Sequence, residues 1–406
     1  MSTAKWTFLV YMAGDNNLAS AGDEDLREMR TVGSTDEVNV VVQFDNAGTR
    51  GTERYRVLAG GDDVVESLGE TDSGDPNVLL DFIRWAHNTC PADRYALVLW
   101  NHGGGWAPSA IDQVAQEIRA PGFGTREAVE RAASPLQRTF FRPSLEAILS
   151  LASPQERAIC SDDGSGHSLD TVELGKVLQK AAADVLGQPI DLLGMDACLM
   201  SNLEVAYEAR PWVRYMVASE ETEPNEGWPY ERVLPRLVAE PGLPTAELAR
   251  HIVSSYTRSY AEREYAGDIT QAAFDLSRLD SLTTALDQLS AALAERLPAV
   301  RGQVWDAHRG TKRFAQNTLA DVGNFGQQVK RTVPEVAEAA DAVLAALQPG
   351  TDAFVVAEEH AGDGVAACTG VTVYLPNALV GISQFYADLE FAKQRQWLRM
   401  VEAYVQ

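Results

Sequence analysis

The chain alternates between short, almost wholly apolar runs and longer stretches with helical periodicity. The apolar runs are rich in β-branched and aromatic residues and are bounded by Gly, Asp, Asn or Pro: Trp6–Ala13, Val38–Asp45, Tyr95–Trp100, Ile190–Asp196 and Tyr215–Ser219. Near-continuous apolarity over so few residues is typical of strands buried on both faces, as in parallel sheets. Strands that alternate with helices predict an α/β sandwich with a mostly parallel sheet.

Local signals for helix starts support this alternation. The dipeptide Asp75-Pro76 has the residue types preferred at the N-cap and first position of a helix, which predicts a helix over Asp75–His87. The stretch Asp170-Thr-Val-Glu173 is a capping-box pattern and predicts a helix over Leu174–Leu186.

Two further regions differ from this pattern. Residues 107–158 hold no strong strand run and contain several prolines, so we expect an insertion of short helices and loops on the rim of the sheet. Beyond residue 243, helices are expected over Thr245–Arg263, Leu279–Leu297 and Val333–Leu347, and strand-like pieces over Ile269–Leu276, Ala353–Ala357 and Gly370–Leu375. The sequence therefore predicts a core over residues 1–240 and a helix-rich unit with a few strands over residues 241–406.

The charge balance excludes some classes of partner. Among 406 residues, 34 Lys and Arg stand against 58 Asp and Glu, a formal net charge of −24. Nucleic acids and anionic membranes are bound by clustered basic side chains, so we expect neither as a partner. The acidity is explained most simply by solubility, although it would also attract a basic substrate.

We expect a cytoplasmic protein, with export by another route left open. No apolar run approaches the about 18 residues that a membrane-spanning helix needs. The first apolar run, Trp6–Ala13, is followed by Gly14-Asp-Asn-Asn17 and not by a small-residue cleavage site. We therefore interpret it as a strand and a turn, not as a signal peptide.

The cysteines and histidines match none of the common metal motifs. The cysteines form no CxxC pair and the histidines no HExxH. The segment Asp162–Glu173 is faintly like a calcium loop, but it lacks the alternating ligands and central glycine of an EF-hand. A turn followed by a helix cap explains it more simply.

Two loops place reactive side chains directly after predicted strands, where open parallel sheets bind their ligands. In Asn101–Trp106 (NHGGGW), His102 precedes three glycines, which allow backbone N–H groups to approach a ligand closely. Cys198 precedes a helix predicted over Asn202–Arg210, whose positive N-terminus would favour the thiolate. A thiolate, an imidazole and backbone donors suffice for acyl transfer. A small buried cysteine and a hydrogen-bonded structural histidine are the alternative.

Three motifs, NHGGGW, DACLM and SEETEP, follow one another in this order. The stretches that hold them and extend them are Trp6–Leu18, Leu79–Trp106, Leu192–Glu208 and Val217–Tyr230, with weaker ones at Phe274–Leu279 and Gly370–Pro376. In these stretches the chain resembles the clostripain family of cysteine peptidases, relatives of caspases, gingipains and legumains. The resemblance implies a caspase-like α/β/α sandwich and a cysteine endopeptidase acting on protein or peptide substrates. It implies no organic cofactor, while calcium dependence, which occurs in some members, is left open.

The resemblance also implies roles for individual residues. His102 matches the family's general acid and base, and Cys198 matches its nucleophile. The oxyanion hole would use the backbone N–H groups of Gly103 and Cys198. We expect no third residue to be required for orienting the histidine.

Cleavage after Arg or Lys is the specificity that the resemblance implies, and it requires a carboxylate in the pocket for that side chain. Asp196 and Glu226 match the family's acids, although the family has Asp at the second position. Glu keeps the charge and adds one methylene. Asp196 could instead cap the turn after its strand. The acidic run Ser219–Glu223 is either a solvated loop or a substrate contact on the same sheet edge as Cys198.

Members of this family are often activated by cleavage between the histidine and the cysteine. The insertion over residues 107–158 offers several sites for an Arg-directed enzyme acting on itself: Arg119, Arg126, Arg131, Arg138, Arg142 and Arg157. The insertion could instead be a lid or a partner-binding surface. The alternative for the whole chain is a catalytically weak relative that binds a partner.

Overall fold

The polypeptide forms two structural units. The computed structural model describes residues 3–15, 18–46, 51–61, 64–101, 103–106, 169–383 and 385–406. One unit comprises residues 1–188 and 225–241, and the other comprises residues 189–224 and 242–406. The division at residue 240 that the sequence suggests is a different partition and stays a prediction. In the described part of the chain, no helix has both the length and the apolarity to cross a bilayer.

The first unit holds strands in the order β5-β1-β2-β3-β4. Their bounds are β1 (Ala4–Gly14), β2 (Val38–Asn46), β3 (Gly51–Arg56), β4 (Val64–Gly69) and β5 (Ala92–Trp100). β1 pairs in parallel with β2 and with β5, while β3 and β4 add antiparallel pairs at one edge. The apolar runs that predicted buried parallel strands thus form β1, β2 and β5.

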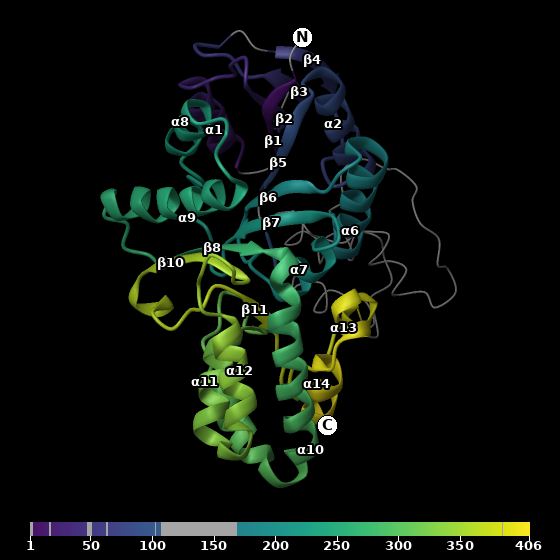
Figure 1. Cartoon of the computed structure of the whole chain (residues 1–406), viewed down its shortest axis with the longest axis vertical. Coiled ribbons are helices and arrows are strands. Elements are labelled where there is room, and N and C mark those ends of the chain that lie inside the picture. Colours follow the sequence, from purple (N-terminus) through teal and green to yellow (C-terminus); the bar gives the residue numbers. More distant parts are fainter. Residues whose placement is uncertain are drawn as a thin grey trace, which may run out of the picture. The chain divides into compact units, whose positions relative to one another are not determined.

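The helices of the first unit lie on both sides of these strands. Their bounds are α1 (Ala19–Arg30), α2 (Pro76–Thr89), α6 (Thr171–Lys180), a π-helical turn (Ala181–Leu186) and α8 (Tyr230–Ala239). The chain passes from β1 to β2 through α1 and returns through α2 to β5, on the other side of β1. Because such crossovers are right-handed, α1 and α2 cover opposite faces of the strands, as Figure 1 shows.

Both predicted helix starts are confirmed in this unit. The Asp75 carboxylate accepts a hydrogen bond of 2.7 Å from the backbone N–H of Asn77, with Pro76 at the first helical position. At the start of α6, Asp170 accepts from the backbone N–H of Glu173 at 2.7 Å, and Glu173 accepts from that of Asp170 at 3.1 Å. The part of the calcium-like segment that the structure describes is therefore a helix cap.

The second unit contains strands in the order β10-β8-β7-β6 and a separate pair, β11-β9. Their bounds are β6 (Ile190–Asp196), β7 (Val213–Ala218), β8 (Ile269–Asp275), β9 (Leu319–Asp321), β10 (Val355–Ala361) and β11 (Thr372–Tyr374). β6 and β7 are parallel, whereas β8 and β10 are antiparallel to their neighbours. The predicted α/β class is confirmed, and the sheet is mixed because antiparallel strands lie beside the parallel ones.

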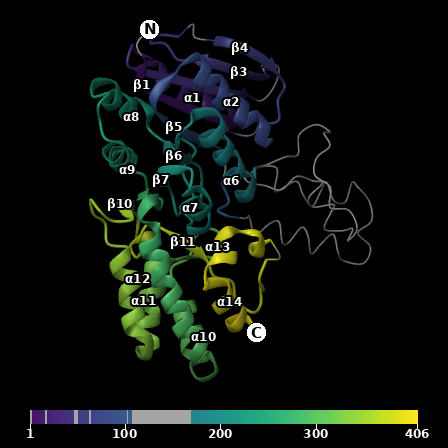
Figure 2. The same cartoon turned by 45° about the vertical axis from the view of Figure 1, so that its right-hand side comes forward.

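The helices of the second unit include a tightly packed group. The bounds are α7 (Leu203–Ala209), α9 (Thr245–Glu262), α10 (Leu279–Gly310), α11 (Val322–Thr332), α12 (Ala337–Ala346), α13 (Glu390–Gln394) and α14 (Trp397–Val405). Figures 1 and 2 show α10, α11 and α12 side by side. α10 is longer than the predicted Leu279–Leu297, because the helix continues through Pro298.

β11 is bonded to the turn that follows β6. The backbone N–H of Thr372 donates to the Ser201 carbonyl at 2.9 Å, and the Asn202 amide donates to the Thr372 hydroxyl at 3.2 Å. The Ser201 hydroxyl also donates to the Gly370 carbonyl. A segment near the end of the chain therefore fixes the backbone between β6 and α7.

Glu204, in the first turn of α7, is a carboxylic acid buried within the second unit. It is fully buried, and its Oε1 accepts hydrogen bonds from the Tyr374 backbone N–H at 3.0 Å and from the Tyr386 hydroxyl at 2.6 Å. Its Oε2 has no hydrogen-bond partner among the described residues. Burial outweighs these hydrogen bonds and raises the pKa of Glu204 from 4.5 to about 7.

This raised pKa predicts a pH-dependent stability that Glu204→Gln should remove. The folded pKa lies above the unfolded value, so the stabilisation is complete below about pH 4.5 and is lost as the pH rises through about 7. As the pH rises from 5 to 8, wild type should lose about 2 kcal/mol of its free energy of unfolding through this group, and the variant should not show this loss. Denaturant unfolding of both proteins at the two pH values measures this loss. If the free energy of unfolding differs between wild type and variant by the same amount at both pH values, the raised pKa of Glu204 is refuted.

Candidate active site

The loop after β5 carries the first of the predicted catalytic motifs. His102 lies outside the described residues, and its position stays a prediction. Gly103 is partly exposed, whereas Trp106 is buried. The Trp106 carbonyl accepts a hydrogen bond of 2.8 Å from the hydroxyl of Thr171, the first residue of α6. This contact fixes the end of the glycine-rich loop to the first unit.

Cys198 lies in the turn after β6 and is partly exposed. The backbone N–H of Glu223 donates a hydrogen bond to its sulfur at 3.3 Å. The backbone N–H of Leu199 donates to the Glu221 carbonyl at 3.2 Å, and that of Ser201 donates to the Ser219 carbonyl at 2.8 Å. The acidic run after β7 therefore lies against the Cys198 turn, which agrees with the predicted common sheet edge. The Cys198 thiol also donates to the Glu223 carbonyl at 3.9 Å, so two backbone groups of Glu223 orient the sulfur.

The helix predicted after Cys198, over Asn202–Arg210, is confirmed. α7 begins at Leu203, and its N-cap is Asn202, whose side chain accepts from the backbone N–H of Val205. The contribution of this N-terminus to the Cys198 thiolate stays a prediction.

The residue after Cys198 has a strained backbone. Leu199 has φ of +62°, in the left-handed region that side chains other than Gly rarely occupy. Such a conformation costs of order 1 kcal/mol and persists only where surrounding contacts enforce it. The hydrogen bond from Leu199 to Glu221 is one of these contacts. Strain of this kind is concentrated at functional sites, where it sets the direction of a reactive side chain.

Two carboxyl groups flank Cys198. Asp196, the last residue of β6, is 4 % exposed. Burial first, and then the charges of Asp196 and Cys198, raise the pKa of Glu223 well above its ordinary value. Glu223 Oε1 accepts from the side-chain amide of Gln271 in β8 at 3.1 Å, while its Oε2 has no hydrogen-bond partner among the described residues. Two acids so close to each other form a site suited to a cation, because a positive charge would favour the ionised form of both.

Tyr256 of α9 belongs to the same surroundings. It is fully buried, and its pKa is raised well above the ordinary value by burial first and then by the charge of Glu223. The approach of Glu223, Gln271 and Tyr256 to the Cys198 turn was not predicted from the sequence. The only sequence signal for it was the place of the acidic run directly after a strand.

The remaining predicted site residue, Glu226, is exposed and belongs to the first unit. Its placement relative to Asp196 stays a prediction. The insertion over residues 107–158, with all the arginines proposed for self-cleavage, lies outside the described residues. Of the other cysteines, Cys90 and Cys368 are buried.

Comparison with known proteins identifies the family. The sequence model of the clostripain family of peptidases matches residues 10–130 and 146–404. Clostripain from Hathewaya histolytica is 26 % identical over 270 residues, which cover 59 % of this chain and 43 % of clostripain. The chain thus spans less than half the length of this curated relative.

Two solved structures share the fold along nearly the whole chain. One is a secreted cysteine protease from Bacteroides thetaiotaomicron in complex with an irreversible peptide inhibitor, with a TM-score of 0.62, 20 % identity and coverage of 98 % of this chain and 99 % of that one. The other is an inactive zymogen protease from Parabacteroides distasonis, with a TM-score of 0.65, 19 % identity and 99 % coverage of both chains. The predicted caspase-like α/β fold is confirmed.

The comparison with solved structures contradicts the predicted cytoplasmic localisation. The protease from Bacteroides thetaiotaomicron that shares the fold is described as secreted. The first apolar run is indeed a buried strand, β1, as the sequence predicted. A buried strand carries no information about the compartment, so the inference from strand to cytoplasm had no physical basis. The match of the family model to most of the sequence, together with the fold, leads to one conclusion: the chain belongs to the clostripain family of cysteine peptidases.

Proposed function

We propose that this chain is a cysteine endopeptidase that cleaves peptide bonds after Arg or Lys. The observation that carries the proposal is the partly exposed Cys198 at the carboxyl end of β6, with Asp196 and Glu223 beside it. A nucleophile next to paired acids suits a peptide substrate with a basic side chain. Membership of the clostripain family and the peptide inhibitor bound to a relative of the same fold support the same reading.

The proposed reaction is acyl transfer through a thioester. His102 takes the proton of the Cys198 thiol as the sulfur attacks the carbonyl carbon of the scissile bond, and it then gives this proton to the leaving amine. Water then attacks the thioester, His102 takes its proton, and the carboxylic acid leaves as the thiol is restored. The backbone N–H groups of Gly103 and Cys198 would hold the oxyanion. These steps use no organic cofactor and no metal ion.

The proposed specificity depends on the acids next to Cys198. A guanidinium or ammonium group placed between Asp196 and Glu223 would favour the ionised form of Glu223 and pair with both carboxylates. Glu226, which matches the second acid of the family by resemblance, would add a charge at the rim. Glu223 is our addition to the pair that the sequence suggested, since its carboxyl oxygen is buried beside Asp196.

Matched fluorogenic peptides ending in Arg, Lys, Asp or Leu test this function. We expect wild-type protein to cleave the Arg and Lys peptides, and Cys198→Ala to cleave none. Parallel assays with added calcium and with a calcium chelator test the calcium dependence that the resemblance leaves open. If folded and processed wild-type protein cleaves none of the peptides, the alternative of a partner-binding relative is favoured instead.

Self-cleavage gives a separate prediction. We propose that the peptidase core spans residues 1–240, that residues 241–406 form an accessory unit, and that processing occurs within residues 107–158. Wild-type protein should then consist of two chains, the first ending at an arginine of this segment and the second beginning with the residue that follows an arginine, whereas Cys198→Ala should stay intact. Intact-mass analysis of both proteins measures this. A fully active wild-type enzyme that consists of one uncut chain would contradict the prediction.

A further inference from the structure

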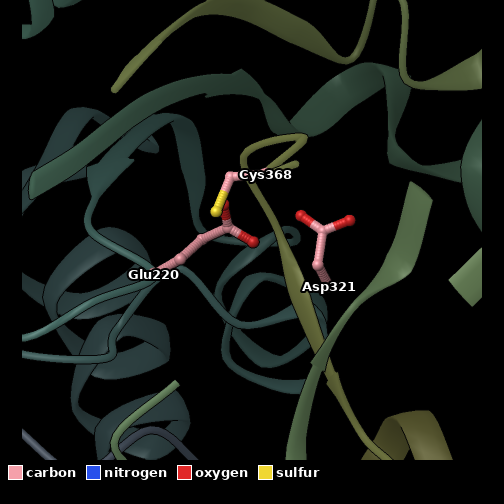
Figure 3. Close-up of side chains that lie close together, drawn as sticks. All are labelled: Glu220, Asp321 and Cys368. Atoms are coloured by element: carbon pink, nitrogen blue, oxygen red, sulfur yellow. The ribbon is translucent and has the colours of Figure 1, made fainter. Parts of the chain in front are cut away.

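The second unit contains a buried group of two acids and one thiol that the proposed reaction does not use. Glu220 follows β7, Asp321 ends β9, and Cys368 precedes β11. One oxygen of each acid and the Cys368 sulfur lie within 4.8 Å of one another. Glu220 and Asp321 are 0 % exposed and Cys368 is 7 % exposed. Figure 3 shows the three functional groups converging from separate segments.

Most of the oxygens in this cluster have donors, and one has none. Asp321 Oδ1 accepts from the Asn324 backbone N–H at 2.6 Å and from the Thr369 hydroxyl at 2.9 Å, and its Oδ2 accepts from the Thr369 backbone N–H at 2.6 Å. Glu220 Oε2 accepts from the Gly370 backbone N–H at 3.0 Å. Glu220 Oε1 is buried without a hydrogen-bond partner among the described residues.

An anionic oxygen left without a donor in a dry interior is costly. Two kinds of partner could satisfy Glu220 Oε1 within this cluster: a proton shared with Asp321, or a cation held by all three groups. A shared proton would involve only the two acids. The Cys368 sulfur lies within 4.8 Å of an oxygen of each acid, and this position favours a cation because the sulfur completes a set of three ligands.

We propose that Glu220, Asp321 and Cys368 form a binding site for a thiol-accepting divalent metal ion of the zinc type. Zn²⁺ accepts both cysteine sulfur and carboxylate oxygen, at about 2.3 and 2.0 Å respectively. Ligands of a tetrahedral zinc ion are about 3.5 Å apart at these bond lengths, so each group would need to move inward by less than about 1 Å. Calcium and magnesium fit poorly, since both require more oxygen ligands and avoid sulfur.

The site would fix the segment that lies against Cys198. Glu220 belongs to the acidic run Ser219–Glu223, whose Glu221 carbonyl accepts from Leu199 and whose Glu223 N–H donates to the Cys198 sulfur. A metal ion would join the segment to Asp321 at the start of α11 and to Cys368 before β11. It would therefore stabilise the geometry of the Cys198 turn without touching the sulfur of Cys198. This inference does not depend on the proposed peptidase activity.

Cobalt binding to the full-length chain tests the site. All proteins would carry Cys198→Ala and Cys160→Ser, so that Cys90 and Cys368 are the remaining thiols. Co²⁺, a spectroscopic substitute for Zn²⁺, would be added to folded protein and also during refolding from denaturant. We expect one equivalent to bind with a near-ultraviolet charge-transfer band from thiolate to cobalt, and Zn²⁺ to displace it.

Three variants in this background identify the ligands. Cys368→Ser should abolish the charge-transfer band, and Glu220→Gln should weaken cobalt binding by at least about tenfold. Cys90→Ser, which alters another buried thiol, should leave the charge-transfer band and the affinity for cobalt unchanged. Circular dichroism verifies that each variant folds, and Glu220→Gln still tests the site if Cys368→Ser does not fold. Absence of the band in the parent protein, or its persistence in Cys368→Ser, would refute the metal site and favour a proton shared by the two acids.

Discussion

Cys198→Ala should lower kcat/KM for Arg and Lys peptides by about four to six orders of magnitude, because without the sulfur no thioester forms. Its fold should be unchanged, since Cys198 is partly exposed and Ala is smaller. Michaelis–Menten kinetics on a fluorogenic Arg peptide measure the loss. Burst kinetics on an activated ester should show acyl-enzyme accumulation in wild type and none in the variant.

His102→Ala should cause a loss of similar size, and the double variant should be no worse than Cys198→Ala. Residues that act in one step are not additive in their effects on the barrier. Cys90→Ser is the matched control, because it removes a thiol that the proposed reaction does not use. Cys90 is buried in the first unit, and this variant should retain full activity. Retention of more than about 1 % of the activity in Cys198→Ala would exclude Cys198 as the nucleophile.

Asp196→Asn and Glu223→Gln should each lower kcat/KM for Arg peptides by about 10² to 10³. Truncating one partner of a buried charge pair costs about 2 to 5 kcal/mol, and each 1.4 kcal/mol is tenfold. Glu226→Gln should have a smaller effect of about threefold, because Glu226 is exposed and water screens its charge. Initial rates on Arg, Lys and Leu peptides measure all three variants. An equal loss on the Leu peptide would indicate damage to the site and not a loss of specificity.

The pH dependence gives a further readout of the same pair. The raised pKa of Glu223 means that it is protonated in the free enzyme until the pH exceeds that value. Because only the ionised form pairs with a cation, KM for the Arg peptide should fall as the pH rises, and Glu223→Gln should flatten this dependence. Glu221→Gln is the matched control: the Glu221 carboxylate pairs with Lys312 at 3.7 Å and should not affect KM.

Elements that depend on neighbours in sequence could be predicted. The Asp75 and Asp170 caps involve residues within a few positions, so the sequence contains the whole interaction. β2 is buried along its whole length and β1 at every position except Lys5, and burial on both faces favours a near-continuous apolar run. By contrast β4 is exposed at nearly every position, so its sequence has no apolar pattern that would reveal a strand.

Other features depend on contacts between distant residues and were missed. Pro298 signals the end of a helix, yet α10 continues past it with a buried face that includes Val300 and Val304. Packing of that face outweighs the lost hydrogen bond. In the candidate site, the order of the strands predicted that the acidic run lies near Cys198. The contact of Glu223 with Gln271 joins β8 to that run, and no local pattern contains it.

The bonds from Thr372 and Gly370 to Ser201 have a consequence for the nascent chain. The left-handed Leu199 lies two residues before Ser201, in a turn that local preferences do not support. Ribosomes make the cysteine of this turn long before residue 372, and the partners of Ser201 are absent until that part of the chain has emerged. The arrangement around Cys198 is therefore completed only after residues 370 and 372 have left the ribosome. A nascent chain that ends before these residues carries the sulfur but not the contacts that fix its turn.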